Sequence, residues 1–365
     1  MKHRVCINEI AKYSKGQQIN GDNLLSDGTY AYLNGGINPS GKWSDYNVEG
    51  NTITISEGGN SCGYVNYMQH PFWCGAHCYY LYDVKGNSKY LYYALKSQQN
   101  RLMGIRSGAC MPNIKKADLG NFKFNYDDNL DRQSEIISTL QLIENILEYR
   151  KNQLAMMDEL IKARFVEMFG DPEQSNKYQY TILEKITNVV SGGTPNRQIY
   201  ENWNNGNIPW IKTTELKNNV ITHSEEYITE QGLKNSSAKV VPKGTILIAM
   251  YGQGKTRGMT GYLGIKACTN QACACILPSK DINSIYLWKY FEFSYNKLRS
   301  LAKGGNQPNL NADNIKKFSI LTPPISLQQQ FADFVTQVTK SKSAIQKSLD
   351  ETQLLFDSLM QKYFG

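Results

Sequence analysis

The chain has 365 residues, 41% hydrophobic and 20% charged, a balance that excludes a disordered protein and is long enough for two domains with separate cores. The net charge of +8 permits a polyanionic partner but does not require one. No stretch approaches the roughly 20 apolar residues of a membrane span, and no apolar signal segment follows the first residues, so we expect a cytoplasmic protein that does not enter a membrane.

The first predicted domain covers residues 1–128 and mixes short strands with helical segments. Alternating apolar residues predict a strand over Asn51–Ser56, and a helical period predicts an amphipathic helix over Lys89–Leu102. Loops containing glycine, such as Gly35-Gly36 and Gly58-Gly59-Asn60, lie between these elements. We therefore expect an α+β domain with exposed glycine-containing loops.

The eight cysteines lack the paired spacing of a disulfide framework, which fits free thiols in a reducing compartment. Cys74, His77 and Cys78, with Cys62 upstream, form the one group that could hold zinc. This group occurs in one half of the chain, and the doubled C-x₂-C pattern of a structural zinc site is missing. We therefore interpret the cysteines as buried strand residues and predict no metal.

A long spacer helix is predicted over 129–170. Its apolar residues follow a spacing of four and three, which defines a heptad seam on one helix face, interrupted by Arg150 and Arg164. The seam residues are Ile136, Leu140, Ile143, Leu147, Leu154, Met157 and Ile161. A helix of ~37 residues is about 55 Å long.

The second predicted domain covers 175–323 and repeats the pattern of the first. It contains a predicted strand over Gly244–Ala249 and a predicted helix over Ile285–Leu301. Gly254-Lys255-Thr256 looks like the end of a phosphate-binding P-loop, but Ala249 stands where that motif requires glycine. We therefore do not predict a nucleotide site.

A second spacer helix is predicted over 324–365, with Lys342 and Thr352 as its polar interruptions. Its seam residues are Phe331, Val335, Val338, Ile345, Leu349, Phe356 and Leu359. Neither helix can bury its seam alone, so we expect the two to pair as an antiparallel coiled coil. The alternative is that each long amphipathic helix packs on its own domain.

The sequence contains an internal repeat. Pro112-Asn113 recurs 196 positions later as Pro308-Asn309, and Tyr90-Leu91 recurs as Tyr286-Leu287. This period is far longer than the roughly 20–50 residues of a solenoid unit. It predicts two similar α+β domains, each followed by a long helix. Such a protein is expected to contact two similar targets at a fixed distance from each other.

Side chains able to contact DNA phosphates or base edges lie in the loops and at helix ends of both domains. In the first domain the candidates are Lys15, Gln17, Asn34, Lys42, Asn60 and Arg106; in the second they are Thr194, Lys212, Thr213, Tyr251, Lys255 and Gln307. No nucleophilic triad, methyltransferase motif or nuclease carboxylate cluster is recognisable, and we predict no catalytic residue. The chain therefore has the features of a binding protein.

These features together resemble the specificity subunit of type I restriction-modification systems. The resemblance covers essentially the whole chain, and the first domain departs from it at Tyr13–Gln17 and at Cys110-Met111. The matching strings are Val190–Pro195, Asn207–Ile211, Met250–Gly252, Asn306–Asn309 and Pro323–Gln329.

The resemblance implies a DNA-recognition subunit without catalytic activity, whose two target-recognition domains read the halves of a gapped double-stranded DNA site. It further implies that the helices carry two methyltransferase subunits, that restriction subunits join the complex, and that S-adenosylmethionine, ATP and Mg²⁺ are bound by those partners and not by this chain. A competing hypothesis is an interaction protein whose coiled coil pairs with another chain and whose domains bind protein. A third is an enzyme with an unrecognised site.

Overall fold

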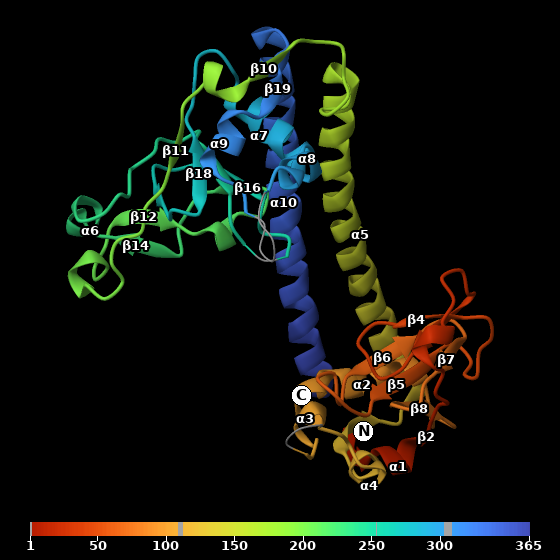
Figure 1. The fold of residues 1–365 in the computed structure, drawn as a ribbon. Coiled ribbons are helices and arrows are strands. Elements are labelled where there is room, and N and C mark those ends of the chain that lie inside the picture. The colour runs from red at the N-terminus through yellow and green to blue at the C-terminus, as the bar shows by residue number, and fades with distance from the viewer. Residues whose placement is uncertain (1, 109–111, 253, 303–308) are drawn as a thin grey trace. The chain divides into compact units, whose positions relative to one another are not determined.

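The computed structural model describes residues 2–108, 112–252, 254–302 and 309–365 (Figure 1). It divides into two compact units. Unit 1 contains the residues up to Asn152 together with Gln346–Gly365, and unit 2 contains Gln153–Ile345. Each unit therefore takes residues from both long helices, whereas the sequence-based boundaries at 128, 170, 175 and 323 divide the chain into consecutive segments.

The described residues of unit 1 form three sheets. The main sheet has the strand order β2-β8-β5-β6, all antiparallel, and the small sheet has the order β4-β3-β7 with β3 and β7 parallel. A third sheet pairs β1 with β9. The strands are β1 (Lys2–Cys6), β2 (Lys12–Lys15), β3 (Tyr30–Leu33), β4 (Gly41–Trp43), β5 (Thr52–Ser56), β6 (Val65–Met68), β7 (Phe72–Cys74), β8 (Cys78–Tyr82) and β9 (Lys123–Asp127). The short helices are α1 (Ile7–Ile10), α2 (Ser88–Ser97), α3 (Gln99–Gly104) and α4 (Lys116–Gly120).

Unit 2 repeats this arrangement. Its main sheet has the order β11-β18-β15-β16-β13, its small sheet the order β14-β12-β17, and β10 pairs with β19. The strands are β10 (Tyr180–Ile182), β11 (Val189–Ser191), β12 (Ile208–Ile211), β13 (Asn219–Ile221), β14 (Glu226–Ile228), β15 (Ile246–Ala249), β16 (Thr260–Leu263), β17 (Cys268–Thr269), β18 (Cys273–Ile276) and β19 (Ser319–Leu321). The short helices are α6 (Glu230–Lys234), α7 (Ser284–Phe293), α8 (Tyr295–Ser300) and α9 (Ala312–Lys316).

The two units share one topology. The small sheet of each has an antiparallel and a parallel pairing around its central strand, β3 in unit 1 and β12 in unit 2. The main sheets correspond strand for strand, with β13 as an additional edge strand in unit 2. The predicted α+β fold with two similar domains is therefore confirmed.

The helical segment that was predicted as continuous in each domain is broken at equivalent residues. Gln98 separates α2 from α3 and Ser294 separates α7 from α8, with φ/ψ of −99°/17° and −91°/19°. No glycine or proline marks either break in the sequence. In unit 1, α2 packs against β5 and β6 of the main sheet (Figure 1).

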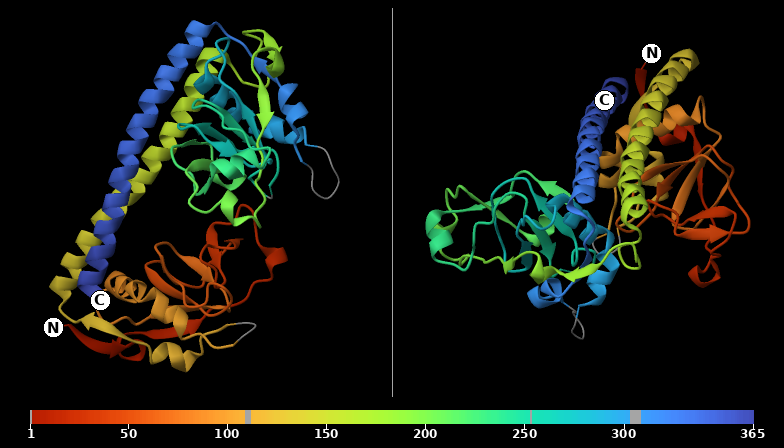
Figure 2. Two further views of the ribbon diagram at one scale, coloured as in Figure 1. Left: turned by 90° about the vertical axis from the view of Figure 1, so that its left-hand side faces the viewer. Right: turned by 90° about the horizontal axis from the view of Figure 1, so that it is seen from above.

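The two long helices are α5 (Leu130–Phe169) and α10 (Ile325–Phe364), each of 40 residues. In unit 1 the first turns of α5 share a core with the last turns of α10, through Ile136, Leu140, Met360 and Phe364. Both views in Figure 2 show this end of α10, in blue, beside the yellow start of α5. In unit 2 the last turns of α5 share a core with the first turns of α10, so the pairing within each unit is antiparallel, as predicted.

The seam follows the predicted heptad rhythm. Ile136, Leu140, Ile143, Leu147 and Ile161 of α5 are buried, as are Phe331, Val335 and Val338 of α10. The remaining predicted seam residues are half-buried, namely Leu154, Met157, Ile345, Leu349, Phe356 and Leu359.

The end of each long helix packs against the tyrosine that the repeat duplicates. Phe169, at the end of α5, lies 5.0 Å from the Tyr286 ring in unit 2, between ring centroids. Phe364, at the end of α10, lies 5.2 Å from the Tyr90 ring in unit 1. Each compact core is therefore completed by the helix that follows the other half of the repeat.

The polar interruptions of the seam are satisfied locally. Lys342 forms an ion pair with Asp158 of α5 inside unit 2, and Thr352 donates its hydroxyl to the Ser348 carbonyl at 2.7 Å. Arg164 forms an ion pair with Glu167 at 2.7 Å. These polar residues therefore enter the helices without leaving a buried unpaired charge.

The described cysteines are free thiols, and Cys62, Cys74, Cys78, Cys268, Cys273 and Cys275 are buried while Cys6 is half-buried. Cys110 lies outside the described residues. Burial raises the pKa of the Cys62, Cys268 and Cys275 thiols, the last two to about 11. Within the described ranges no group of three or more metal-ligating side chains gathers, and no helix is both long and apolar enough to cross a membrane.

Candidate nucleic-acid interface

Two of the candidate residues of unit 1, Lys15 and Asn34, lie in a cluster around Glu57, which follows β5. Lys15, at the end of β2, forms an ion pair with Glu57 and lies 5.5 Å from the Tyr79 ring centroid. His77 Nδ1 lies 3.4 Å from the same carboxylate, and the His77 amide donates to Asn34 Oδ1 at 3.2 Å. Lys15 and Asn34 therefore occupy one polar cluster at one end of the main sheet.

A second loop joins this cluster through backbone hydrogen bonds. The Ile114 amide donates to the Glu57 carbonyl at 2.9 Å, and the Gly59 amide donates to the Pro112 carbonyl at 3.0 Å. Asn60 is exposed in the first of these loops, and Arg106 is exposed where the second begins. Burial raises the pKa of the Cys62 thiol, and the positive charge of Arg106 opposes this effect.

Gln17 lies in the segment that leaves β2. Its side chain is exposed, while its backbone amide donates to the Cys74 carbonyl at 2.9 Å and its carbonyl accepts from Trp73 Nε1 at 2.8 Å. Lys42 is exposed in the middle of β4, on the small sheet, whereas Glu57 follows β5 of the main sheet.

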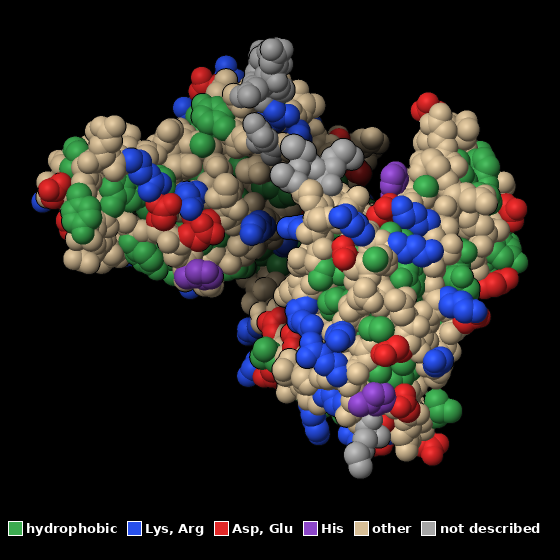
Figure 3. Space-filling view, turned by 90° about the horizontal axis from the view of Figure 1, so that it is seen from below, with side chains coloured by type: hydrophobic (Ala, Val, Ile, Leu, Met, Phe, Trp, Pro, Cys, Tyr) green, Lys and Arg blue, Asp and Glu red, His purple; other side chains and the backbone are tan. Residues whose placement is uncertain are grey.

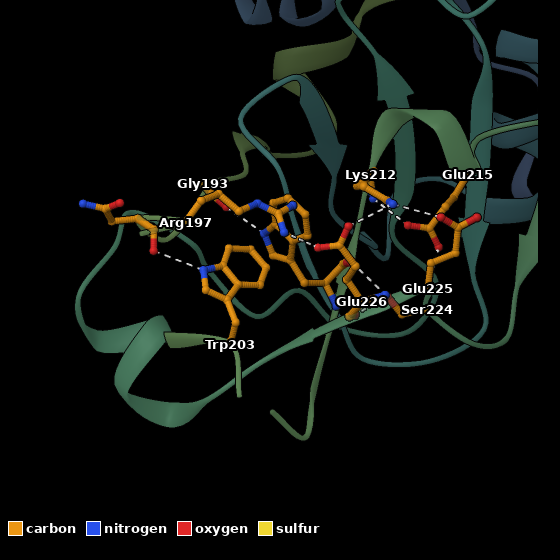
Figure 4. Close-up of polar contacts among 10 residues, drawn as sticks. Gly193, Arg197, Trp203, Lys212, Glu215, Ser224, Glu225 and Glu226 are labelled. Atoms are coloured by element: carbon orange, nitrogen blue, oxygen red, sulfur yellow. Dashed lines mark hydrogen bonds and ion pairs between the residues drawn. The ribbon is translucent and has the colours of Figure 1, made fainter. Parts of the chain in front are cut away.

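In unit 2, Lys212 belongs to a polar network that also contains Arg197, Glu225 and Glu226 (Figure 4). Arg197 forms an ion pair with Glu226, and Lys212 lies 2.9 Å from both Glu225 and Glu226. The Lys212 amide donates to Glu215 Oε1 at 2.8 Å, which fixes the turn at Thr213. Thr194 donates its hydroxyl to Gln271.

Two tryptophan rings pack against the Arg197 guanidinium of this network. The guanidinium of Arg197 lies 3.9 Å from the Trp203 ring centroid and 4.9 Å from that of Trp210, in cation–π geometry. The rings themselves meet edge to face at 5.1 Å. Trp210 Nε1 donates to the Gly193 carbonyl at 2.9 Å.

The acidic and basic groups of this network favour one another's ionised forms. Hydrogen bonds from Arg197 and Lys212 lower the pKa of the Glu226 carboxyl against the opposing effect of burial. Hydrogen bonds to Glu225 and Glu226 raise the pKa of Lys212. Lys212 must therefore exchange carboxylate partners for a phosphate if it contacts DNA.

Tyr251 and Lys255 lie in the loop after β15, and both are exposed. The Leu310 amide donates to the Met250 carbonyl at 3.1 Å, as the Ile114 amide does to Glu57 in unit 1. The loops after β5 and β15 are therefore equivalent, and each carries candidate residues. Gln307 lies outside the described residues.

Five residues that position the candidate residues were not predicted from the sequence, namely Glu57, Arg197, Glu226, Trp73 and Trp210. A charged residue directly after a buried strand was the available signal for Glu57. The roles of the tryptophans depend on contacts between distant segments, for which the sequence carries no signal. Figure 3 shows groups of lysine and arginine side chains on one face, with acidic side chains among them, so the surface is mixed rather than uniformly basic.

This arrangement is a duplicated α+β unit whose two sets of polar loops lie on matching scaffolds. A family described as the type I restriction modification DNA specificity domain matches residues 2–156 and 176–352. The chain therefore belongs to the family of type I restriction-modification DNA specificity proteins.

Similar proteins agree with this assignment. A putative type I specificity subunit of Mycoplasma genitalium is 34% identical over 145 residues, which are 39% of this chain and 38% of that protein. The EcoR124I/EcoR124II specificity subunit of Escherichia coli is 24% identical over 62% of this chain and 56% of its own length. The matched segments thus span about two fifths to just over half of these relatives.

Solved structures share the fold. The crystal structure of the type I restriction-modification S subunit from M. genitalium superposes with a TM-score of 0.68 at 21% identity, covering 100% of this chain and 96% of that one. A chain from a structure on complex assembly and conformational transition of the type I restriction-modification system gives 0.57 at 12% identity, covering 99% and 97%. The fold predicted from the resemblance is therefore confirmed.

Proposed function

We propose that this chain recognises a bipartite, gapped double-stranded DNA sequence as the specificity subunit of a cytoplasmic type I restriction-modification complex. The observation that carries the proposal is the duplication itself. Two units of one topology present different side chains at equivalent loops, such as Asn60 in one unit and Tyr251 and Lys255 in the other. Equivalent placement with different chemistry suits two reading surfaces for two different half-sites.

The contacts divide into two kinds in this proposal. Exposed lysines and arginines such as Lys42, Arg106 and Lys255 contact phosphates and supply affinity that does not depend on sequence. Gln17, Asn60 and Tyr251 present amide or hydroxyl groups from the loops and contact base edges. The chain itself catalyses nothing; methyl transfer from S-adenosylmethionine and ATP- and Mg²⁺-dependent restriction belong to the partner subunits.

The partner surface we propose is the outer face of the long helices. In unit 1, Leu142, Tyr149 and Leu355 are 62%, 63% and 51% exposed, although they are large and apolar. In unit 2, Met156 and Leu160 of α5 are 72% and 50% exposed. Apolar side chains at helical spacing that face water are typical of a surface that another helix covers. We infer that one methyltransferase subunit docks on each unit.

A domain exchange tests the recognition role. Residues 1–128 are replaced by the corresponding domain of a relative with another target, and the methylated motif is determined by sequencing the host DNA. The expected result is a motif changed in one half only. A motif changed in both halves, or in neither, would contradict the proposal.

A surface substitution tests docking. Leu142→Glu places a charge on the exposed apolar strip and should abolish co-purification of the methyltransferase subunit without lowering the melting temperature. Gln141→Glu, one residue away and also exposed, is the matched control and should leave co-purification unchanged. Equal loss in both variants would show that charge on the helix, rather than the strip, disrupts assembly.

A further inference from the structure

One loop in each unit crosses from the main sheet to the small sheet by the same hydrogen bonds. In unit 1 the Gly16 amide donates to the Cys78 carbonyl at 3.4 Å and the Gln17 amide to the Cys74 carbonyl at 2.9 Å. In unit 2 the Gly192 amide donates to the Cys273 carbonyl at 3.3 Å and the Gly193 amide to the Thr269 carbonyl at 2.9 Å. Because β8 corresponds to β18 and β7 to β17, Gln17 and Gly193 occupy equivalent positions.

The crossing is close in both units. A Cβ atom on Gly16 would lie 1.9 Å from the Cys74 carbonyl oxygen, and one on Gly192 would lie 2.1 Å from Thr269 Oγ1. Only glycine allows this approach of the backbone to the neighbouring strand. The first residue of the loop therefore lies in close backbone contact with the small sheet in both units.

An indole N–H reaches the equivalent carbonyl in each unit. Trp73 Nε1 donates to the Gln17 carbonyl at 2.8 Å, and Trp210 Nε1 donates to the Gly193 carbonyl at 2.9 Å. The first tryptophan lies on β7 and the second on β12, which are different strands of the small sheet.

The two tryptophans do not occupy equivalent positions in the two units. Within the sheet registers, Trp210 corresponds to Tyr32 of β3, and Trp73 corresponds to Cys268 of β17. Tyr32 contacts the same loop two residues later, because its hydroxyl lies 3.2 Å from the Ile19 carbonyl and 3.3 Å from the Ile19 amide. The two units therefore reach the same hydrogen bond from different positions of one scaffold.

A bond to the carbonyl of one residue fixes the peptide plane that leads to the next. In unit 2 this plane joins Gly193 to Thr194, and in unit 1 it joins Gln17 to Gln18. We expect the side chains of Gln17 and Thr194 to contact DNA. A displacement of this peptide group by about 1 Å would misplace those side chains relative to a base edge, where hydrogen-bond geometry is strict.

We propose that Trp73 and Trp210 are positioning residues for DNA recognition: each uses its indole N–H to fix the loop that reads one half-site. This inference rests on the proposed recognition function and deepens it. The tryptophans do not touch DNA themselves. Trp73 acts on the half-site read by unit 1, and Trp210 acts on the half-site read by unit 2.

The loop of unit 2 has a second anchor of the same kind. Trp203 Nε1 donates to the Asn196 carbonyl at 3.1 Å, and the Arg197 guanidinium covers both tryptophan rings. Residues 193–197 are thus held at two carbonyls and one side chain. Such support of a binding loop by rigid aromatic groups is what precise placement of a contact requires.

The test substitutes each tryptophan by phenylalanine in the full-length chain. Each variant is produced with its methyltransferase partner in a host without type I modification, and the methylated motif is determined by sequencing. Trp210→Phe should relax discrimination at one or more positions of one half-site by about tenfold, the scale of a lost base contact, and leave the other half intact. Trp73→Phe should relax the other half.

Two control variants keep the result specific. Trp288→Phe removes a buried indole bond of 2.9 Å to Thr260 in unit 2, away from the loop, and should leave the motif unchanged. Trp43→Phe replaces the indole ring beside Trp73, whose centroid lies 6.3 Å away, by a smaller ring and should also leave the motif unchanged. If Trp210→Phe changes the motif no more than Trp288→Phe does, the proposal is overturned.

A benzothienyl analogue of tryptophan at position 210 separates the hydrogen bond from the fold, because sulfur replaces the N–H and the ring keeps its shape. Relaxation of one half-site by the analogue supports the proposal. Loss of discrimination at both half-sites would overturn it, because the indole N–H would then affect the whole protein and not one recognition loop. If the wild-type chain itself yields no bipartite motif, the proposed function fails, which is a different outcome from an unchanged motif in the variants.

Discussion

The side-chain carbonyl of Gln133 accepts a 2.9 Å hydrogen bond from the backbone amide of Asn87, and this joins the start of α5 to the residue that caps α2. Gln133 is 1% exposed and also donates to the Asp127 carbonyl at 2.7 Å. Unit 2 contains the same joint: Gln328 accepts from the Asn283 amide at 2.8 Å and donates to the Pro323 carbonyl at 2.8 Å. Both buried amides therefore fix the angle at which a long helix leaves its domain.

Replacement of Gln133 by leucine should destabilise unit 1. The substitution keeps the volume but leaves the Asn87 amide and the Asp127 carbonyl without these partners, at a cost of about 1–3 kcal/mol for each buried group. Urea denaturation measures the change. Gln141→Leu, on an exposed position of the same helix, is the control and should change stability by less than about 0.5 kcal/mol. Equal effects of the two would show that Gln133 has no special role in the joint.

Much of this architecture could be predicted because it depends on periodicity and repetition. The heptad spacing from Ile136 to Ile161 predicts which face of α5 is buried. Tyr90 and Tyr286, which the repeat duplicates, lie at equivalent positions in the two cores. Gln133 and Gln328 are also a repeated pair, and a buried glutamine at the start of a helix is recognisable only when its distant partner is known. The sequence therefore predicts elements and their order better than the joints between them.

The breaks at Gln98 and Ser294 and the tryptophan contacts could not be predicted for a physical reason. Neither break carries a glycine or proline, so packing in the tertiary structure decides where the helix ends. Trp73 and Trp210 approach equivalent carbonyls from different strands, so no shared sequence motif records the interaction. Alignment of the two halves by sequence hides this equivalence, and only the sheet register reveals it.

Substitution of Leu147 by aspartate should strongly destabilise unit 1. Leu147 is 6% exposed on the seam of α5, so the variant buries an unpaired carboxylate and loses the packing of the leucine. We expect a loss of several kcal/mol in the free energy of unfolding. Leu142→Asp makes the same chemical change where the side chain is 62% exposed, and thermal unfolding should show a much smaller effect. A similar drop in both variants would mean that Leu147 is not part of a buried seam.

Neutralisation of Glu57 should strengthen binding to DNA of any sequence. Its carboxylate is paired with Lys15 and lies 3.4 Å from His77, so Glu57→Gln frees a cation at the candidate interface. One additional phosphate contact would steepen the slope of log K against log salt concentration by about 0.9. Fluorescence anisotropy with a random duplex at several salt concentrations measures this slope.

The control for Glu57 is another acidic residue of the same domain. Glu49→Gln makes the same change in net charge at an exposed position outside the cluster, so it separates the release of Lys15 from a general change in charge. We expect its slope to equal that of the wild type. If Glu57→Gln and Glu49→Gln behave alike, Lys15 does not contact phosphate.

The network of Glu226 should make the stability of unit 2 depend on pH. Arg197 and Lys212 lower the pKa of the Glu226 carboxyl below its ordinary 4.5, so the folded state favours the ionised form more than the unfolded state does. The contribution of Glu226 to stability is therefore complete above about pH 4.5 and is lost as the pH falls through the lowered value. Glu226→Gln should unfold at a lower temperature than the wild type at pH 7.

The difference between the two proteins is the informative quantity, because other carboxylates also titrate on acidification. We expect the gap in melting temperature between wild type and Glu226→Gln to be largest near pH 7 and to shrink steadily below pH 4.5, since protonation removes from the wild type what the substitution has already removed. Glu225→Gln is the matched control: the Glu225 side chain is 58% exposed and its carboxylate pairs with Lys212, and such exposed ion pairs contribute about 0–1 kcal/mol. Its gap should be smaller at pH 7. A Glu226→Gln gap that stays constant from pH 7 to pH 3 would show that the ion pairs with Arg197 and Lys212 do not stabilise the fold.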